Sequence, residues 1–373
     1  MNSNFWSKLS ISKEASPEGI ISKEAPINLK TDDSMKVFTN TDYSAVDMKF
    51  VLNHSASISG NSHILDNKLY QHNVNIKIVN SENHTELYGF ILSLPHSILL
   101  KKYDNVNEII NTGVTTDLCV HKDYRSKNLA AHLILGVIHY GFTNNIYTGY
   151  HYIKECKSES SLKISNYYRP LNLKASLAAG YEIPSFRIKD YILKSFTSDE
   201  QLLKMEYEYK INSSYNSKYN ITDSVFEDLK YLQNNDRKLS VALDEERFNF
   251  MKANGFKFKT VTKDLNHKSF IVGLFIYKNR VLYIGSSKKS LNTASMALIE
   301  VSQNNTYEIV QTIFDYLSKD GYSVMTGSLF GNLNDNTLRK QLSMVICGYQ
   351  YLDFYNLHVV HNNNVSNINL LYF

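Results

Sequence analysis

The stretch 115–134, "TTDLCVHKDYRSKNLAAHLI", constrains the fold more than any other part of the chain. Its first residues form a short apolar run behind two polar residues, which predicts a strand. Leu129 and Leu133 lie at helical spacing and predict a helix that begins soon afterwards. Arg125 and Lys127 stand in the loop between them. A strand, a short loop and a helix in immediate succession are typical of mixed α/β domains.

The loop has the composition of an anion-binding turn. The N–H groups of the first turn of a helix have no partner within the helix, and they carry the positive end of the helix dipole. Arg125 and Lys127 add cationic donors, and Ser126 and Asn128 are residue types that cap helices. An ordinary capped helix with solvated charges has the same composition, so the loop alone leaves both interpretations open.

The flanking sequence predicts a sheet on either side of this block and a second, similar cycle later in the chain. Residues 73–80 and 87–100 predict strands that precede it, because the first alternates apolar and polar residues and the second is nearly continuously apolar. Residues 212–224 are rich in Ser, Asn and Lys and predict a boundary. The later cycle is predicted to contain a helix at 225–233, strands at 269–277 and 280–286, an amphipathic helix over 306–322 that ends at Gly321, and a strand at 349–360.

We therefore predict a mixed α/β fold with an internal pseudo-repeat. The expected regions are a polar N-terminal arm or lid at 1–35, a first half at 36–211 and a second half at 212–373. A length of 373 residues fits about two domains or two large halves.

Composition excludes several classes of function. The net charge of +4 is small and evenly spread, which argues against nucleic acid as a partner. Three widely separated cysteines support neither a disulfide framework nor a metal cluster, so we expect no bound metal and a reducing compartment, the cytoplasm. The opening residues lack the pattern of a secretion signal, and no apolar stretch is long enough to predict a membrane span.

The block "DLCVHKDYRSKNLAAHLI" resembles a segment of N-myristoyltransferases that reads Phe-Leu-Cys-Val-His-Lys, two variable positions and Arg-Ser-Lys-Arg-Leu. Other segments resemble that family more weakly and in the same order: "NFWS" (4–7), "SKEAPINL" (22–29), "DYS" (42–44), "IYTGYHYIK" (146–154), "YYRPLN" (167–172) and "NDNTLRKQLSMVICGYQYLDFYN" (334–356). The resemblance covers nearly the whole chain.

The resemblance implies both a fold and an activity. The fold is two GNAT-like halves related by a pseudo-twofold, with acyl-CoA bound by the first half, peptide bound by the second, and the C-terminus returning to the active site. The activity is transfer of myristoyl from myristoyl-CoA to the amine of an N-terminal glycine on protein substrates. Myristoyl-CoA is then a substrate, no cofactor is bound permanently, and we expect a monomer.

The resemblance also assigns roles to individual residues. The amides of Asp117 and Leu118 would form an oxyanion hole, and the C-terminal carboxylate of Phe373 would act as the base. Thr148 would position the amine, and Thr116 stands where the family has Asn. Phe5 and Trp6 would stack on the adenine of CoA, while its phosphates would be held by the residues of the loop and helix start: Arg125, Ser126, Lys127, Asn128, Leu129 and Ala130. Tyr147, Tyr168 and Gly348 fall at peptide-binding positions, and His121 is expected to be a core or loop histidine.

The resemblance fails in the segments that contact the substrate peptide in the family. Only 12 residues (30–41) stand where the family has a long helical segment and an acidic loop that reads a basic substrate residue. The family's Gly-Asp-Gly is replaced by Ile346, Cys347 and Gly348. Three hypotheses follow: an active glycine N-myristoyltransferase with a reduced peptide site, a catalytically weak protein that binds acyl-CoA or a myristoylated partner, and a GNAT-type acyltransferase with another acyl chain or a lysine acceptor.

Overall fold

The computed structural model describes residues 18–26, 35–40, 49–50, 74–80, 82, 86–102, 106–153, 161–178, 218–233, 236–265, 268–284, 289–359 and 367–371. The chain forms two compact units. Unit 1 comprises residues 1–162, 242–247 and 351–363, and unit 2 comprises 163–241, 248–350 and 364–373. The predicted boundary at 212 differs from this division, because the units separate after Leu162 and unit 1 also takes two short segments from the later part of the chain, 242–247 and 351–363.

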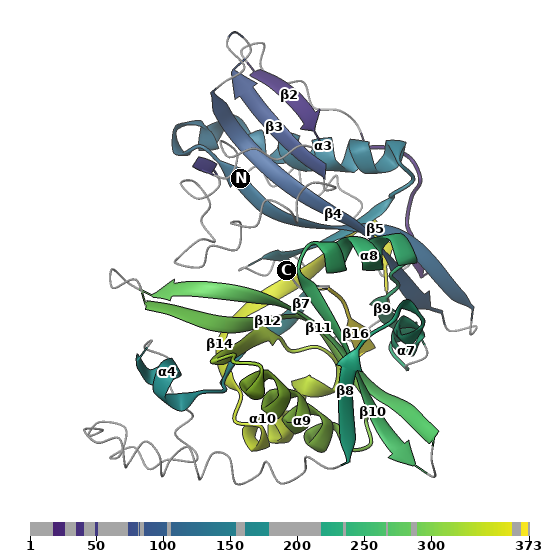
Figure 1. Cartoon of the computed structure of the whole chain (residues 1–373). Helices are drawn as coiled ribbons and strands as arrows, with labels where there is room; N and C mark the ends of the chain where they lie inside the picture. The colour runs from purple at the N-terminus through teal and green to yellow at the C-terminus, as the bar shows by residue number, and fades with distance from the viewer. Residues whose placement is uncertain are drawn as a thin grey trace. The chain divides into compact units, whose positions relative to one another are not determined.

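Unit 1 is built on a mixed sheet with one long helix, α3, on a face of it (Figure 1). Its elements are β1 (Gly19–Ile20), β2 (Met35–Asn40), β3 (Val74–Asn80), β4 (Leu87–Lys101), β5 (Asn107–Val120), the 3-10 helix η2 (Lys122–Lys127), α3 (Leu129–Thr143), β6 (Thr148–Ile153) and β15 (Leu357–His358). The strand order is β2-β3-β4-β5-β6, and the second half of β14 (Val345–Tyr355) follows β6. The pairs from β2 to β5 are antiparallel, whereas β5 and β6 are parallel because α3 carries the chain back between them.

The core of unit 1 lies between α3 and the sheet. Leu129 and Leu133 on α3 pack against Ile76, Ile78 and Ile91 of the strands. The predicted helix is confirmed as α3, and its buried residues include Ala131 and Leu135 besides Leu129 and Leu133.

Unit 2 repeats this order of elements. It contains β7 (Leu162–Pro170), α4 (Leu173–Ala178), β8 (Tyr219–Asp223), η5 (Phe226–Leu229), α7 (Lys230–Gln233), β9 (Leu239–Val241), α8 (Glu245–Ala253), β10 (Phe256–Leu265), β11 (Lys268–Ile284), β12 (Lys289–Val301), α9 (Thr306–Lys319), β13 (Val324–Ser328), η7 (Gly331–Asn334), α10 (Asn336–Gln341) and β16 (Ile368–Asn369). Leu162, the first residue of β7, and residues 245–247 of α8 are counted with unit 1. The strand order is β8-β10-β11-β12-β13-β7.

The repeat between the two units can be followed element by element. In both units an antiparallel meander is followed by a helix and a parallel strand: β5, α3 and β6 in unit 1, and β12, α9 and β13 in unit 2. The predicted mixed α/β class with an internal repeat is therefore confirmed at the level of strand order.

Two sequence expectations for unit 2 are corrected. The strands predicted at 269–277 and 280–286 are one continuous strand, β11, because Lys278, Asn279 and Arg280 stay paired with β12 instead of forming a turn. The strand predicted over 349–360 is interrupted at Asn356, whose φ of 53° ends β14 before β15 begins. The helix predicted at 306–322 is confirmed as α9, and Gly321 follows it with a φ of 86°.

None of the helices in the described ranges has the length and apolar character needed to cross a membrane.

Candidate functional site

A β-bulge interrupts strand β5 at Asp117 and Leu118. Phe90 of β4 pairs with Cys119 and Leu92 pairs with Thr116, so two residues of β5 stand opposite Ile91 alone. The parallel ladder between β5 and β6 ends just before this point, at Thr115 and His151. A bulge leaves a residue unpaired and turns the local backbone, so its main-chain N–H groups can bond outside the sheet.

The chain leaves β5 through η2, whose start is fixed by His121. The N–H of Tyr124 donates to the carbonyl of His121 at 3.0 Å, and the N–H of Asp123 donates to its ring Nδ1 at 3.3 Å. Phe50 stacks on the same ring with centroids 6.4 Å apart. His121 is thus a loop histidine that caps η2, as the sequence predicted.

Asn128 joins η2 to α3 in the left-handed conformation, with φ of 57°. Its side chain makes no cap bond among the described residues, whereas its carbonyl accepts the N–H of Ala131 at 3.0 Å. The prediction that this side chain caps the helix is wrong: Asn128 tolerates the left-handed turn instead. The N–H groups of Leu129 and Ala130, at the start of α3, have no partner within the helix.

The loop side chains at this helix start are exposed and basic. Arg125, Ser126, Lys127 and Asn128 are all exposed. Arg125 Nε donates weakly to the carbonyl of Val120 at 3.4 Å, and Lys127 Nζ lies 5.1 Å from the ring centroid of Tyr124. The structure therefore brings together the predicted phosphate-binding residues at the positive end of α3.

Two close contacts fix α3 against the sheet and so fix the position of its start. A Cβ added at Gly89 would lie 2.9 Å from Leu133 Cδ1, and one added at Gly136 would lie 2.9 Å from Ile76 Cγ2. A side chain at either position would force its neighbour to move, so the two glycines allow this close approach. The helix start and the bulge are thus held by one packed helix–sheet layer (Figure 1).

Thr148 lies away from the bulge. It pairs with Thr112, and its hydroxyl donates to the carbonyl of Asn111 at 3.3 Å. Thr112 precedes Asp117 by five residues, which is about 16 Å along a strand. The geometry therefore gives no support to the prediction that Thr148 positions an amine beside the oxyanion hole.

A buried polar pair on the same face as Thr148 was not predicted from the sequence. Tyr150 Oη lies 2.9 Å from His96 Nε2, and His96 Nδ1 lies 3.1 Å from the carbonyl of Leu94. This arrangement fits a neutral imidazole that donates from Nδ1 and accepts the tyrosine proton. Burial lowers the pKa of His96 to about 4 and raises the pKa of Tyr150. The pair is fully buried beside an apolar core, which points to a packing role.

His151, on the opposite face of β6, is a second unpredicted histidine. It pairs with Thr115 on one side and with Asp353 of β14 on the other. Burial lowers the pKa of His151, while the Asp353 carboxylate opposes that shift. His151 and Thr115 form the last pair of the β5–β6 ladder before the bulge.

The predicted peptide-binding residues are divided between the two units: Tyr147 belongs to unit 1, and Tyr168 and Gly348 belong to unit 2. In unit 1, Tyr147 donates through its hydroxyl to Asn145 Oδ1 at 2.9 Å. In unit 2, Tyr168 is 8% exposed and packs with Leu291 and Val324, and its contact with peptide stays a prediction. Gly348 has open space where a side chain would stand.

Several predicted residues lie outside the described part of the chain. They are Phe5, Trp6 and Phe373, together with the side chains of Thr116 and Asp117. Leu118 is 40% exposed, which leaves an apolar side chain accessible beside the bulge.

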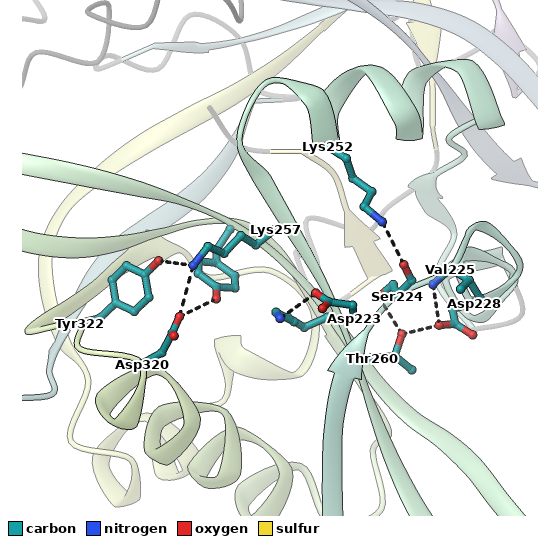
Figure 2. A network of polar contacts seen from close by, with 11 residues as sticks. Asp223, Ser224, Val225, Asp228, Lys252, Lys257, Thr260, Asp320 and Tyr322 are labelled. Atoms are coloured by element: carbon teal, nitrogen blue, oxygen red, sulfur yellow. Dashed lines mark hydrogen bonds and ion pairs between the residues drawn. The ribbon is translucent and has the colours of Figure 1, made fainter.

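Figure 2 shows a cluster of polar side chains in unit 2 that form hydrogen bonds and ion pairs with one another. Lys257 Nζ donates to Asp320 Oδ2 at 3.3 Å and to Tyr322 Oη at 3.1 Å. Thr260 Oγ1 donates to Asp228 Oδ2 at 2.8 Å, and that carboxylate also accepts the N–H of Val225 at 3.1 Å. These bonds fasten the C-terminal end of α9 and the 3-10 helix η5 to β10. Within the described ranges, no group of three or more His, Cys, Asp or Glu side chains could hold a metal ion.

The comparisons with known proteins agree with this geometry. Residues 30–156, which contain the bulge and the helix start, match the family model "Myristoyl-CoA:protein N-myristoyltransferase, N-terminal domain". This part of the chain is therefore similar to the N-terminal domain of N-myristoyltransferases. The matched segment is about a third of the chain, and a search of curated protein sequences gave no significant match.

Solved structures extend the likeness in fold to the whole chain. An N-myristoyltransferase from Saccharomyces cerevisiae with bound myristoyl-CoA has a TM-score of 0.69 at 13% identity, covering 100% of this chain and 99% of that chain. A second structure of the yeast enzyme with myristoyl-CoA gives 0.68 at 14% identity, covering 100% and 94%. A third, with myristoyl-CoA and inhibitors, gives 0.68 at 15% identity, covering 96% and 91%. The protein therefore has the fold of the N-myristoyltransferase structures.

Proposed function

We propose that the protein transfers a myristoyl group from myristoyl-CoA to the N-terminal glycine amine of protein substrates. The observation that carries the proposal is the bulge at Asp117 and Leu118, followed directly by an exposed basic loop and the start of α3. The matched family segment contains both features. Myristoyl-CoA is a substrate in this proposal, and no cofactor is bound permanently.

The bulge supplies donors for the thioester. As the amine nitrogen attacks the carbonyl carbon, negative charge develops on the carbonyl oxygen, and the amides of Asp117 and Leu118 would donate to it. One such donor is worth ~10²–10³ in rate. Backbone donors survive the change of side chain from the family's Phe to Asp117.

The basic loop holds the CoA end. Arg125 and Lys127 would neutralise the phosphates, and the N–H groups of Leu129 and Ala130 would donate to their oxygens. Ser126 and Asn128 complete the loop, and the stacking of Phe5 and Trp6 on the adenine stays part of the proposal. A cradle of this kind positions the thioester relative to the bulge because α3 is locked to the sheet at Gly89 and Gly136.

The amine needs only modest help to lose its proton. An α-ammonium has a pKa near ~8, so about a tenth is neutral at pH 7. The C-terminal carboxylate of Phe373 is the proposed base: it takes the proton as the amide bond forms and the CoA thiolate leaves. Thr116 and Thr148 remain proposed partners of the amine, and Thr148 pairs with Thr112 in the β5–β6 ladder.

We propose that the peptide-binding site has fewer groups that contact the substrate than it has in the family. The segment 30–41 is too short for the family's acidic loop, and Tyr168 is buried, so few groups remain to read the side chains of the substrate. Tyr147 and Gly348 stay candidates for contact with the peptide. We further propose that the protein acts as a monomer in the cytoplasm.

Mass spectrometry tests the proposal directly. The full-length protein is incubated with a Gly-starting peptide and either myristoyl-CoA or acetyl-CoA, and a peptide with Ala in place of the first Gly is the control. We expect a gain of one myristoyl group on the Gly peptide alone. Acylation with acetyl-CoA, or on a lysine of the Ala peptide, would instead support a GNAT-type acyltransferase.

A second candidate function is acyl-CoA binding without transfer. The position of Thr148 and the burial of Tyr168 favour it, because neither supports the predicted contact with the acceptor peptide. A protein that binds myristoyl-CoA tightly by calorimetry but leaves every peptide unmodified would establish this function.

A further inference from the structure

The hairpin of β10 and β11 in unit 2 extends past the neighbouring strand β12. Strand β11 pairs with β12 from Gly273 onward, and the N–H of Ser302, just after β12, donates to the carbonyl of Val272 at 2.8 Å. Residues 268–271 pair with β10, and no other strand of the described chain pairs with them. Figure 1 shows this end of the hairpin at the lower right, as two strands that run beyond α9.

Two large apolar side chains share one face of the hairpin end with two lysines. Lys263 lies opposite Phe270, and Leu265 lies opposite Lys268. Residues directly opposite each other on antiparallel strands share a face, and so do residues two apart on one strand. The four side chains therefore form one surface, which we call the hairpin patch. Leu265 and Phe270 are each 49% exposed, so most of the apolar surface of the patch is in contact with solvent.

The charge of the hairpin patch is positive. Lys268 is exposed, and Lys263 Nζ lies 6.0 Å from the ring centroid of the buried Tyr219, so its aliphatic stem lies over apolar surface. Asp264 lies on the opposite face of the hairpin, where its carboxylate accepts Asn220 Nδ2 at 3.0 Å. The carboxylate and the two ammonium groups are thus on different faces.

A lipid surface with anionic headgroups fits this combination. Lysines close to such a surface are attracted by its negative potential, and apolar side chains beside them bury their exposed parts at the boundary of the acyl chains. A third exposed lysine, Lys218, precedes β8 next to Tyr219 and adds to the positive charge. A stable protein interface buries about 800 Å² on each partner, of which two half-exposed side chains supply only a small part.

We propose that the hairpin patch docks unit 2 on an anionic lipid surface. The patch combines a small apolar contact with a few lysines, so binding is weak and reversible, with a constant of the order of ~10⁴ M⁻¹. The proposal goes beyond the acyl transfer proposed above and uses no residue of the loop at Arg125 and Lys127.

The test is flotation of the full-length protein with vesicles of phosphatidylcholine, either pure or mixed with phosphatidylserine. One variant combines Leu265→Thr with Phe270→Thr, which removes the apolar contact and keeps residues that favour strands. A second combines Lys263→Gln with Lys268→Gln, which removes the charge. A thermal transition at the wild-type temperature shows that each variant folds.

Matched controls lie elsewhere on unit 2. Val225→Thr changes an apolar residue that is 55% exposed, and Lys230→Gln changes an exposed lysine at the start of α7. Both controls should float as the wild-type protein does.

We expect the wild-type protein to float with the mixed vesicles at low salt and to be released at high salt, because lysines supply part of the attraction. The lysine variant should bind at least about fivefold more weakly, the contribution expected from one lysine near an anionic surface. The apolar variant should bind about tenfold more weakly and keep its salt dependence.

The outcomes decide between occupants of the patch. Equal flotation of the wild-type protein and both variants, no flotation with mixed vesicles, or equal flotation with pure phosphatidylcholine would each overturn the proposal. A wild-type dimer in light scattering that the apolar variant converts to a monomer would assign the patch to a second copy of the chain, and this also overturns it. Acylation of a glycine peptide in buffer without vesicles should be the same in all variants, so its failure in the wild-type protein refutes the proposed function and not the docking surface.

Discussion

Replacing Arg125 and Lys127 together by alanine tests whether the loop before α3 binds the CoA phosphates. Both side chains are exposed, and the contacts described for them are a 3.4 Å hydrogen bond and a cation–π contact at 5.1 Å. Their removal should therefore change the free energy of unfolding by no more than about 0.5 kcal/mol. Any loss of acyl-CoA affinity then reports on the ligand and not on the fold.

The expected loss of affinity follows from the exposure of the loop. Two charge-assisted contacts of about 1.5–3 kcal/mol each would give about 3–6 kcal/mol in a buried site. Solvent screening at an exposed loop reduces this sum, and we expect about 2 kcal/mol, a roughly 30-fold rise in the Kd for myristoyl-CoA. The salt dependence of the Kd should weaken as well, because two cations no longer neutralise phosphate.

Isothermal titration calorimetry at low and high salt measures both effects. Lys122→Ala is the matched control, since Lys122 is an exposed lysine of the same 3-10 helix that lies outside the predicted phosphate-binding positions. An affinity that is unchanged in the double variant, or lowered equally by Lys122→Ala, would refute a specific phosphate site at this loop.

Three further predictions test the base, the peptide site and a buried histidine. Deleting residues 371–373, or adding a C-terminal tag, should lower kcat by ~10²–10⁴ with acyl-CoA binding retained, whereas Phe373→Leu should keep most activity; full turnover of a tagged protein would exclude the C-terminal base. A peptide panel should show little preference for Lys over Ala near the seventh residue, because the acidic loop is missing; a strong preference would locate that reader elsewhere. The pKa of His96 is about 4 in the folded protein against about 6.5 unfolded, so only the unfolded state gains a proton between these values. Stability should fall by about 3 kcal/mol as the pH drops from 6.5 to 4, and chemical denaturation of His96→Gln should show a flatter dependence.

The elements that could be predicted from the sequence are those whose signal is local. Residues 73–80, 87–100 and 306–322 carry a clear period or an unbroken apolar run, and the structure confirms them as β3, β4 and α9. The loop at Arg125 and Lys127 was predicted correctly because a strand, a basic turn and a helix follow one another without a gap.

The errors arise where pairing decides the outcome. Lys278, Asn279 and Arg280 read as a turn, yet the partner strand β12 holds them in β11. Likewise the bulge at Asp117 depends on which residues of β5 lie opposite Ile91 of β4. The sequence of one strand does not show the register in which it pairs with the next. The role of Thr148 rests on resemblance alone and stays a prediction, and the β5–β6 ladder adds only that it pairs with Thr112.

Buried polar groups are the hardest features to predict, because their partners are distant in sequence. Glu300 accepts hydrogen bonds from Arg237, 63 residues away, and from Asn369, 69 residues away. It lies near the end of β12, after an apolar run. By its type, a glutamate at the end of a strand is expected to be solvated. Only the fold shows that the three side chains satisfy one another inside the core, and none of them belongs to a sequence motif.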